Sequence, residues 1–205
     1  HGPRVALTLD ACTGQADQRI LQALIDNRIP ATIFATARWL KRNGPALTEI
    51  KTHPDLFEVE NHGARHLPAV EVPGTVYGIP TAGSVGALRR EVEDGAAAVK
   101  AATGREPLWF RGATGKYTSA VITLITGWHF RIAGYSLIAD EGAMLGRATT
   151  AHRIEAAKDG DVIIAHVNQP AKPAGLGVID GVLALKAKGF VFVRLEDAFT
   201  KPVAN

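Results

Sequence analysis

Two histidines, His62 and His66, stand four positions apart in the sequence, separated by Gly63, Ala64 and Arg65. On a helical turn, this spacing places both imidazole rings on one face, close enough to share a cation. The same spacing also occurs on ordinary polar surfaces, so the pair alone is a weak signal. Other polar residues must converge on the pair before it predicts a metal site.

Three further reactive side chains each come directly after a short apolar run. They are Asp10, Arg111 and His166. If these runs are barrel strands, their carboxyl ends meet at one rim, which is where barrel enzymes place their chemistry. A guanidinium at that rim can hold a carboxylate by two hydrogen bonds, and a histidine there can donate a proton. These positions strengthen the prediction of a metal site at His62 and His66.

The apolar runs alternate with helical patterns along the chain. We expect strands at 5–9, 31–35, 57–60, 108–110, 130–133, 162–165 and 190–193, and helices at 17–28, 45–51, 84–102, 118–126, 149–158 and 177–188. Residues 67–83, rich in proline and glycine, are expected to form a loop over one face. Because only a crossover helix returns the chain to the same edge, the order predicts an α/β fold with parallel strands. A doubly wound sheet also fits, but the rim residues favour a deformed (β/α) barrel with about seven strands.

Length and composition are those of a single globular domain over residues 1–205, with 46% hydrophobic and 21% charged residues. The net charge of +3 and the scattered basic residues argue against a dedicated nucleic-acid surface. No apolar run approaches the roughly 18 residues of a membrane helix, and the single cysteine, Cys12, excludes an intrachain disulfide. We expect a secreted or periplasmic protein whose leader has been removed, although a cytoplasmic protein would look the same. Nothing in the sequence indicates an oligomeric state.

Four segments, taken in order, resemble the motifs of the polysaccharide deacetylases, the NodB-homology group that is also called carbohydrate esterase family 4. They are residues 8–11 (TLDA), 61–66 (NHGARH), 110–114 (FRGAT) and 164–166 (IAH). Residues 181–199 also look like the end of that family's domain, so the resemblance covers about 5–199. No single motif is specific, but the ordered set is.

The resemblance implies a distorted barrel and a divalent metal, usually zinc, that activates a water molecule. By position, His62 and His66 would be metal ligands and Asp10 the general base. Arg111 would orient Asp10, and His166 would be the acid that protonates the leaving group.

Two further residues are candidate substrate contacts. Asn61 would either cap the turn that carries the histidines or touch substrate. Thr114 follows the third motif, and a backbone N–H near Ala113 or Thr114 could share the oxyanion with the metal.

The sequence departs from the family pattern at the usual third metal ligand. An aspartate that binds the metal normally follows the first one, and here that position is Ala11. Since zinc prefers three or four protein ligands, three repairs are open: Asp10 binds the metal itself, Cys12 supplies a thiolate, or solvent fills the gap. We favour Asp10. The family's aspartate-containing fourth motif is barely visible at Asp140 and Glu141.

The leading hypothesis is a metal-dependent hydrolase that removes N- or O-linked acetyl groups from a carbohydrate polymer or oligosaccharide. It would act on non-peptide carbon–nitrogen or ester bonds, with an acetylated glycan as partner and zinc as cofactor. Two alternatives stay open. One is a glycan-binding relative that is non-catalytic or weakly active because of Ala11, and the other is a hydrolase of small non-peptide amides.

Overall fold

The computed structural model describes residues 2–199. Residue 1 and residues 200–205, which the sequence analysis includes in the single domain, lie outside the described residues. The strands are β1 (Arg4–Ala11), β2 (Ala31–Ala35), β3 (Phe57–Asn61), β4 (Thr75–Val76), β5 (Ile79–Pro80), β6 (Trp109–Phe110), β7 (Arg131–Ile132), β8 (Leu137–Ile138), β9 (Val162–His166) and β10 (Val191–Val193). The helices are α1 (Gln18–Asp26), α2 (Ala37–Arg42), α3 (Gly44–Thr52), α4 (Val85–Thr103), α5 (Ser119–Gly127), α6 (Arg147–Glu155), α7 (Ala174–Ala187) and α8 (Leu195–Phe199).

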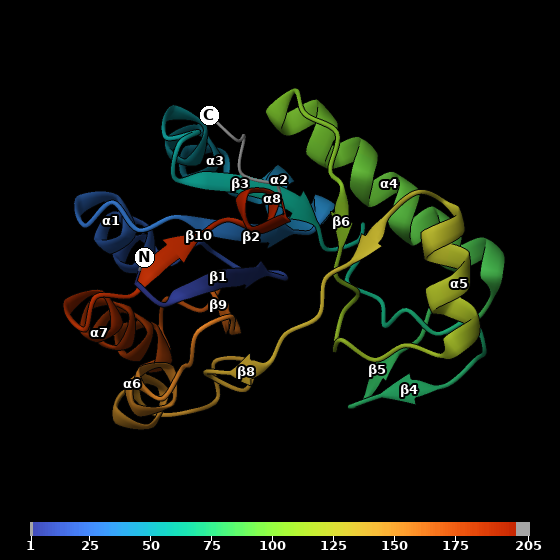
Figure 1. Ribbon diagram of the computed structural model, residues 1–205. Helices are drawn as coiled ribbons and strands as arrows, with labels where there is room; N and C mark the ends of the chain where they lie inside the picture. The colour runs from blue at the N-terminus through green and yellow to red at the C-terminus, as the bar shows by residue number, and fades with distance from the viewer. Residues whose placement is uncertain (1, 200–205) are drawn as a thin grey trace.

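One curled parallel sheet forms the centre of the molecule (Figure 1). Its strands follow the order β7-β6-β3-β2-β1-β9-β8, and β10 also pairs with β1. Among the described residues the end strands β7 and β8 do not pair with each other, so the sheet is an open half-barrel. The predicted deformed α/β barrel is therefore confirmed.

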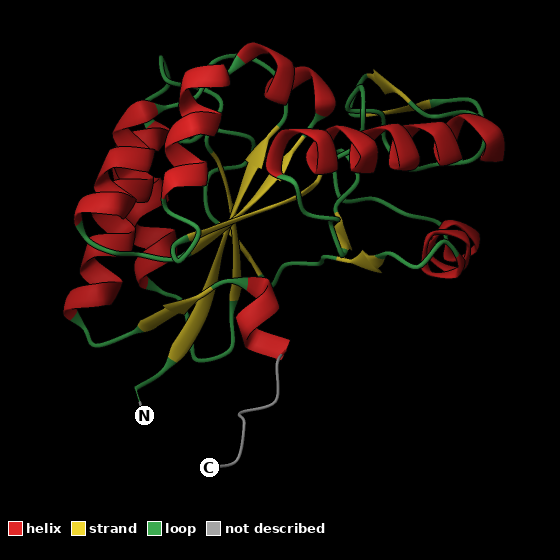
Figure 2. Ribbon diagram, turned by 90° about the horizontal axis from the view of Figure 1, so that it is seen from above, coloured by secondary structure: helices red, strands yellow, loops and turns green. Residues whose placement is uncertain are grey.

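Helices cover the outside of this sheet. Helices α1, α6 and α7 lie side by side on the β9 side, and α4 lies on the β3 side beyond α2 (Figure 1). Seen from above, the strands fan out between these two groups of helices (Figure 2). Within residues 2–199, no helix is both long and apolar enough to cross a bilayer.

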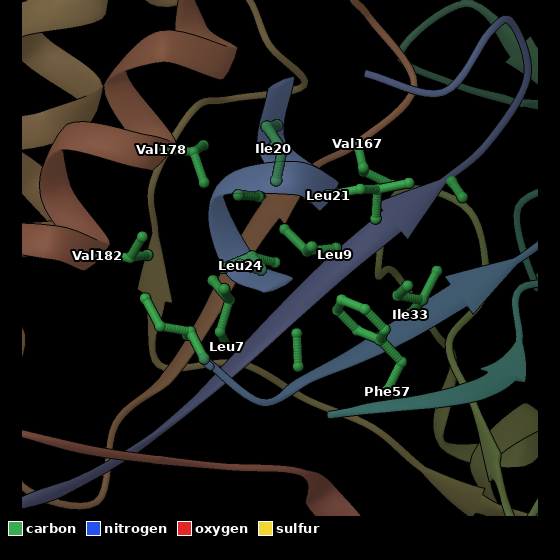
Figure 3. Close-up of a cluster of buried hydrophobic side chains, with 14 of the residues drawn as sticks. Leu7, Leu9, Ile20, Leu21, Leu24, Ile33, Phe57, Val167, Val178 and Val182 are labelled. Carbon is green, nitrogen blue, oxygen red and sulfur yellow. The ribbon is translucent and has the colours of Figure 1, made fainter. Parts of the chain in front are cut away.

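The central strand β1 has two faces with different surroundings. Val5, Leu7, Leu9 and Ala11 belong to the main hydrophobic core between sheet and helices, where Leu7 and Leu9 lie close to α1 (Figure 3). Because side chains alternate along a strand, Asp10 points to the opposite face, into the barrel. One face of β1 therefore packs in the core, and the other carries Asp10 into the barrel.

The barrel interior contains buried polar side chains. The Thr32 hydroxyl donates to Glu58, which also accepts the backbone N–H of Glu196 at 3.2 Å. Glu60 accepts the backbone N–H of Trp109 at 2.7 Å. Both carboxyl groups are buried, and burial raises their pKa values.

Most of the predicted elements are confirmed. Ser84 caps α4, which ends at Gly104 in the left-handed conformation with φ +77°. Three features were not predicted: α2, β8 and the β4–β5 ribbon. The ribbon lies within the expected loop 67–83. Helix α2 has six residues and each of these strands has two, so they are too short to show a hydrophobic period.

We expect Glu60 to make stability depend on pH. Burial raises its pKa from 4.5 to about 8, so the folded protein keeps a proton that the unfolded chain loses. The free energy of unfolding should therefore fall as the pH rises from 4.5 to about 8, by up to about 1.4 kcal/mol per pH unit. The Glu60→Gln variant, which cannot ionise, should flatten this slope in denaturant titrations across the interval. Exposed Glu93→Gln is the control, and a wild-type slope in Glu60→Gln would contradict the assignment.

Candidate active site and metal centre

A compact group of metal-ligating side chains lies at the carboxyl-terminal rim of the barrel. Cys12 Sγ lies 3.4 Å from His62 Nε2, and the His62 and His66 rings have centroids 5.0 Å apart. One ligand atom from each of the three residues lies within 4.8 Å of the others. Neighbouring sulfur and nitrogen ligands of a tetrahedral zinc are separated by about 3.5 Å. The donor set and its spacing therefore fit a zinc-type metal.

The chain that carries the two histidines is an irregular loop, so the expected helical turn is wrong. Gly63 has φ +85° and His66 has φ +66°, and both values lie in the left-handed region. The Ala37 N–H donates to the Gly63 carbonyl at 3.1 Å, which ties the loop to the start of α2. Backbone reversals at these two residues, and not helical periodicity, bring the rings together.

Buried Glu91 on α4 holds this loop from behind. Its carboxylate accepts the backbone N–H groups of Arg65 and Leu67 at 2.9 and 3.0 Å. Its backbone carbonyl accepts the Ala64 N–H at 2.9 Å. The side chain is 1% exposed, so these bonds satisfy a carboxylate that would otherwise be buried without partners.

Asn61 forms a second brace beneath the loop. Its amide nitrogen donates to the Val92 carbonyl at 2.8 Å, and its amide oxygen accepts the Gly63 N–H at 2.8 Å. Asn61 is 0% exposed and both atoms of its amide bond to backbone, which fits the capping role, whereas the contact with substrate stays a prediction. Gly95 on α4 permits this close approach, since an added Cβ would lie 2.7 Å from the Gly63 carbonyl carbon.

Asp10 is held by a buried guanidinium. Arg111 Nη1 donates to Asp10 Oδ1 at 2.9 Å, while Asp10 Oδ2 lies 3.7 Å from His62 Nε2. Burial alone would raise the pKa of Asp10, but Arg111 and then His62 and His166 lower it below its ordinary value. Asp10 is therefore an ionised carboxylate with one oxygen engaged and the other directed toward the histidine pair.

His166 is oriented by Asp140. Its Nδ1 lies 2.8 Å from Asp140 Oδ1, and its backbone N–H donates to Asp140 Oδ2 at 2.7 Å. Burial opposes a charged ring, yet the bond to Asp140 and the neighbouring Cys12 raise the pKa of His166 well above its usual range. A protonated imidazole at this position can act as a general acid.

Cys12 lies between the imidazole rings and is 9% exposed. Burial would raise the pKa of its thiol, but nearby His62 and hydrogen bonds from His166, His62 and His66 lower it well below the usual value. These neighbours favour the thiolate, which is the form that binds metals.

The third member of the ligand group differs from the favoured expectation. Among the described residues, the one group of three or more side chains close enough to hold a metal contains Cys12 and not Asp10. Ala11 is 0% exposed and faces the hydrophobic core, so a longer side chain there would enter apolar packing. Alanine thus stands where the family has a carboxylate, and the sulfur of the next residue, which directly follows β1, lies beside His62.

Thr114 follows Arg111 in a left-handed conformation with φ +68°. Its hydroxyl is buried and has no hydrogen-bond partner among the described residues. An unsatisfied buried hydroxyl is uncommon, so it stays a candidate for substrate contact.

Sequence reasoning missed the positioning role of Glu91. It looks like any helical glutamate, and only its burial on α4 reveals that role. The sequence indicates Asp140 only as part of the barely visible fourth motif, and the two-residue strand β8 before it gives no pattern that would direct it to His166. Cys12 lies two positions after Asp10, and strand alternation could have indicated that both side chains share a face.

A family model described as polysaccharide deacetylase matches residues 1–133. The chain belongs to the polysaccharide deacetylase family. The matched segment of this deacetylase-family chain contains Asp10, Cys12, both loop histidines and Arg111, whereas Asp140 and His166 follow it. No curated protein matches the chain.

Solved structures support the same fold. The esterase domain of a multidomain xylanase from the hindgut metagenome of Trinervitermes trinervoides is 20% identical, with a TM-score of 0.77 over 100% of this chain and 93% of that one. A peptidoglycan deacetylase from Bacillus subtilis is 18% identical, with a TM-score of 0.77 over 95% and 89% of the two chains. A pseudoenzyme of the same esterase family from Bacillus anthracis is 20% identical, with a TM-score of 0.74 over 96% and 65%. A protein named as a deacetylase and one named as a pseudoenzyme therefore share this fold.

We expect Glu91 to control metal affinity by holding the histidine loop. Glu91→Ala should weaken Zn²⁺ binding by on the order of tenfold or more, since residues that support metal ligands commonly have effects of this size. Titration against a chromophoric zinc chelator measures the change. Glu93→Gln, on the exposed side of the same helix, is the matched control. Unchanged zinc affinity in a folded Glu91→Ala protein would contradict this role.

Proposed function

We propose that this protein is a metal-dependent hydrolase that removes N- or O-linked acetyl groups from a carbohydrate polymer or oligosaccharide. The observation that carries the proposal is the Cys12–His62–His66 group, which lies beside an ionised carboxylate, Asp10, and a protonated imidazole, His166. A ligand group, a base and an acid at one rim are the parts that metal-assisted hydrolysis requires.

Cys12, His62 and His66 are the residues that would hold the metal, and zinc is the expected ion because thiolate and imidazole are ligands that it favours. The bound metal would polarise the acetyl carbonyl and lower the pKa of a water molecule. His62 is kept in a fixed orientation because its Nδ1 lies 2.6 Å from the Arg111 carbonyl oxygen. This contact leaves Nε2 directed toward Cys12.

Asp10 is the proposed general base. Its Oδ1 accepts the Arg111 bond, so its Oδ2 is the atom that takes the proton from the attacking water. Arg111 keeps the carboxylate ionised and fixes its orientation, because the guanidinium also donates to Thr8, Ala133 and Gly134. A base held in this way loses little entropy when the reaction begins.

His166 is the proposed general acid. Asp140 holds Nδ1, so Nε2 is the atom that can donate a proton to the departing amine or alcohol. Because the leaving group depends on the glycan, the same acid serves both N-acetyl and O-acetyl substrates. Thr114 remains the proposed substrate contact at the mouth.

Membership of the family and the names of the similar structures support a glycan as substrate. A carbohydrate polymer is found outside the cytoplasm in many cells, so we also propose a secreted or periplasmic location. The pseudoenzyme among the similar structures favours keeping a non-catalytic glycan-binding protein as the second candidate, because Ala11 replaces the usual ligand here.

The first test is acetate release from acetylated oligosaccharides. Wild type loaded with zinc should release acetate, and a chelator should abolish the activity until zinc is restored. His62→Ala and His66→Ala should each reduce the rate by on the order of a hundredfold or more, because two ligands alone bind the metal weakly. Glycan binding without acetate release would favour the binding protein, and turnover of small amides alone would favour the other alternative.

The second test asks whether Cys12 is the third ligand. The Co²⁺-loaded protein should show a near-ultraviolet thiolate-to-metal charge-transfer band, and Cys12→Ser should lose it. Cys12→Asp should bind Co²⁺ without the band. Asp10→Asn is the control and should retain both the metal and the band while losing activity. Loss of metal in Asp10→Asn, with the metal retained in Cys12→Ser, would instead make Asp10 the ligand.

A further inference from the structure

A basic hollow lies beside the metal-ligand group. It is open, has a volume of about 700 Å³ and is lined by Thr13, Arg38, Lys41 and Arg42. The three cationic side chains are exposed and all come from α2. Positions 38, 41 and 42 share one helical face because they are three and four residues apart.

These cations are left without partners. Among the described residues, Arg38, Lys41 and Arg42 form neither an ion pair nor a side-chain hydrogen bond, whereas most other arginines pair with a carboxylate. Like charges that are four residues apart on a helix repel each other. The arrangement therefore weakens the free protein slightly and favours any anion that enters the hollow.

Helix electrostatics explain only part of this pattern. Lys41 and Arg42 lie in the last turn of α2, where cations favour the helix dipole. Arg38 is the second residue of the helix, and a cation is unfavourable there. Helix stability therefore does not account for a cation at this position.

The hollow is fixed to the metal-ligand group by short connections. Thr13 directly follows Cys12 in the chain. The Thr36 hydroxyl, which caps α2, donates to the Cys12 carbonyl at 2.5 Å, and the next residue, Ala37, donates to the Gly63 carbonyl at 3.1 Å. A ligand in the hollow therefore lies next to the ligand group and can belong to the same molecule as the reacting group.

We propose that this hollow binds the carboxylate of a sugar unit that neighbours the acetylated sugar, so the substrate is an acidic glycan. The inference rests on the proposed function for the position of the acetylated sugar. Two guanidinium groups offer forked donors that match carboxylate oxygens, and Lys41 adds a third charge. The net charge of the whole chain is only +3, so it does not reveal this local concentration of cations on α2.

The test compares one glycan in two forms. The probes are an oligosaccharide that alternates N-acetylglucosamine with glucuronic acid, and the same oligosaccharide with its carboxyl groups reduced to alcohols. Zinc-loaded protein should bind the acidic form more tightly by on the order of tenfold, as measured by calorimetry, and added salt should remove the difference. The triple variant Arg38→Gln, Lys41→Gln, Arg42→Gln should bind both forms with similar affinity.

The matched control removes three exposed cations elsewhere: Arg4→Gln, Arg90→Gln and Lys158→Gln. It has the same net charge as the test variant, so it should retain the preference for the acidic glycan. Equal binding of both forms by wild type, or loss of the preference in the control variant, would overturn the proposal. A dependence on the three α2 cations that is seen with a DNA duplex or with phosphatidylglycerol vesicles, and not with the acidic glycan, would also overturn it.

The two proposals fail in different ways. If no glycan releases acetate but the carboxylate preference persists and depends on α2, the acidic-glycan site stands without the hydrolase. If the triple variant deacetylates neutral and acidic oligosaccharides as wild type does, with an unchanged KM, the hydrolase stands and the acidic-glycan site is rejected.

Discussion

The buried guanidinium of Arg111 is the interaction on which the site depends. It donates to Thr8 and Asp10 on β1 and to the carbonyls of Ala133 and Gly134 after β7, and it lies 4.3 Å from the Phe34 ring. The sheet does not close between β7 and β8, so these bonds join its central strand to one side of the opening. An unpaired buried cation would be costly, and the four acceptors together satisfy it.

The other residues of the site are positioned relative to Arg111. His62 contacts the Arg111 backbone, and its loop is held by Asn61 and Glu91, which accept the backbone N–H groups of Gly63, Arg65 and Leu67. These bonds keep two left-handed residues of the loop in place and use only Nδ1 of the His62 ring, which leaves its Nε2 directed toward Cys12.

The alternation of side chains along β1 limits which positions can supply a third metal ligand. Asp10 lies on the face of β1 that points into the barrel, Ala11 packs in the core, and Cys12 directly follows the strand beside His62. A thiolate at Cys12, flanked by histidines, would supply the soft ligand that two imidazoles lack. The Thr36 hydroxyl at the start of α2 donates to the Cys12 carbonyl, so the proposed metal ligation and the proposed recognition of a carboxylate would share one short connection.

The sequence by itself determined the strand–helix alternation, the deformed barrel and the convergence of Asp10, Arg111, His166 and the histidine pair. These follow from local patterns, since strand and helix periods and strand-end positions are readable from neighbouring residues. Only the tertiary structure decided that Cys12 joins the histidine pair, that Glu91 holds the histidine loop and Asp140 orients His166, and that the cations of α2 line a hollow together with Thr13. Each of these depends on residues more than twenty positions apart, and no local period encodes such contacts. Burial and backbone reversals, which exist only in the folded chain, bring them together.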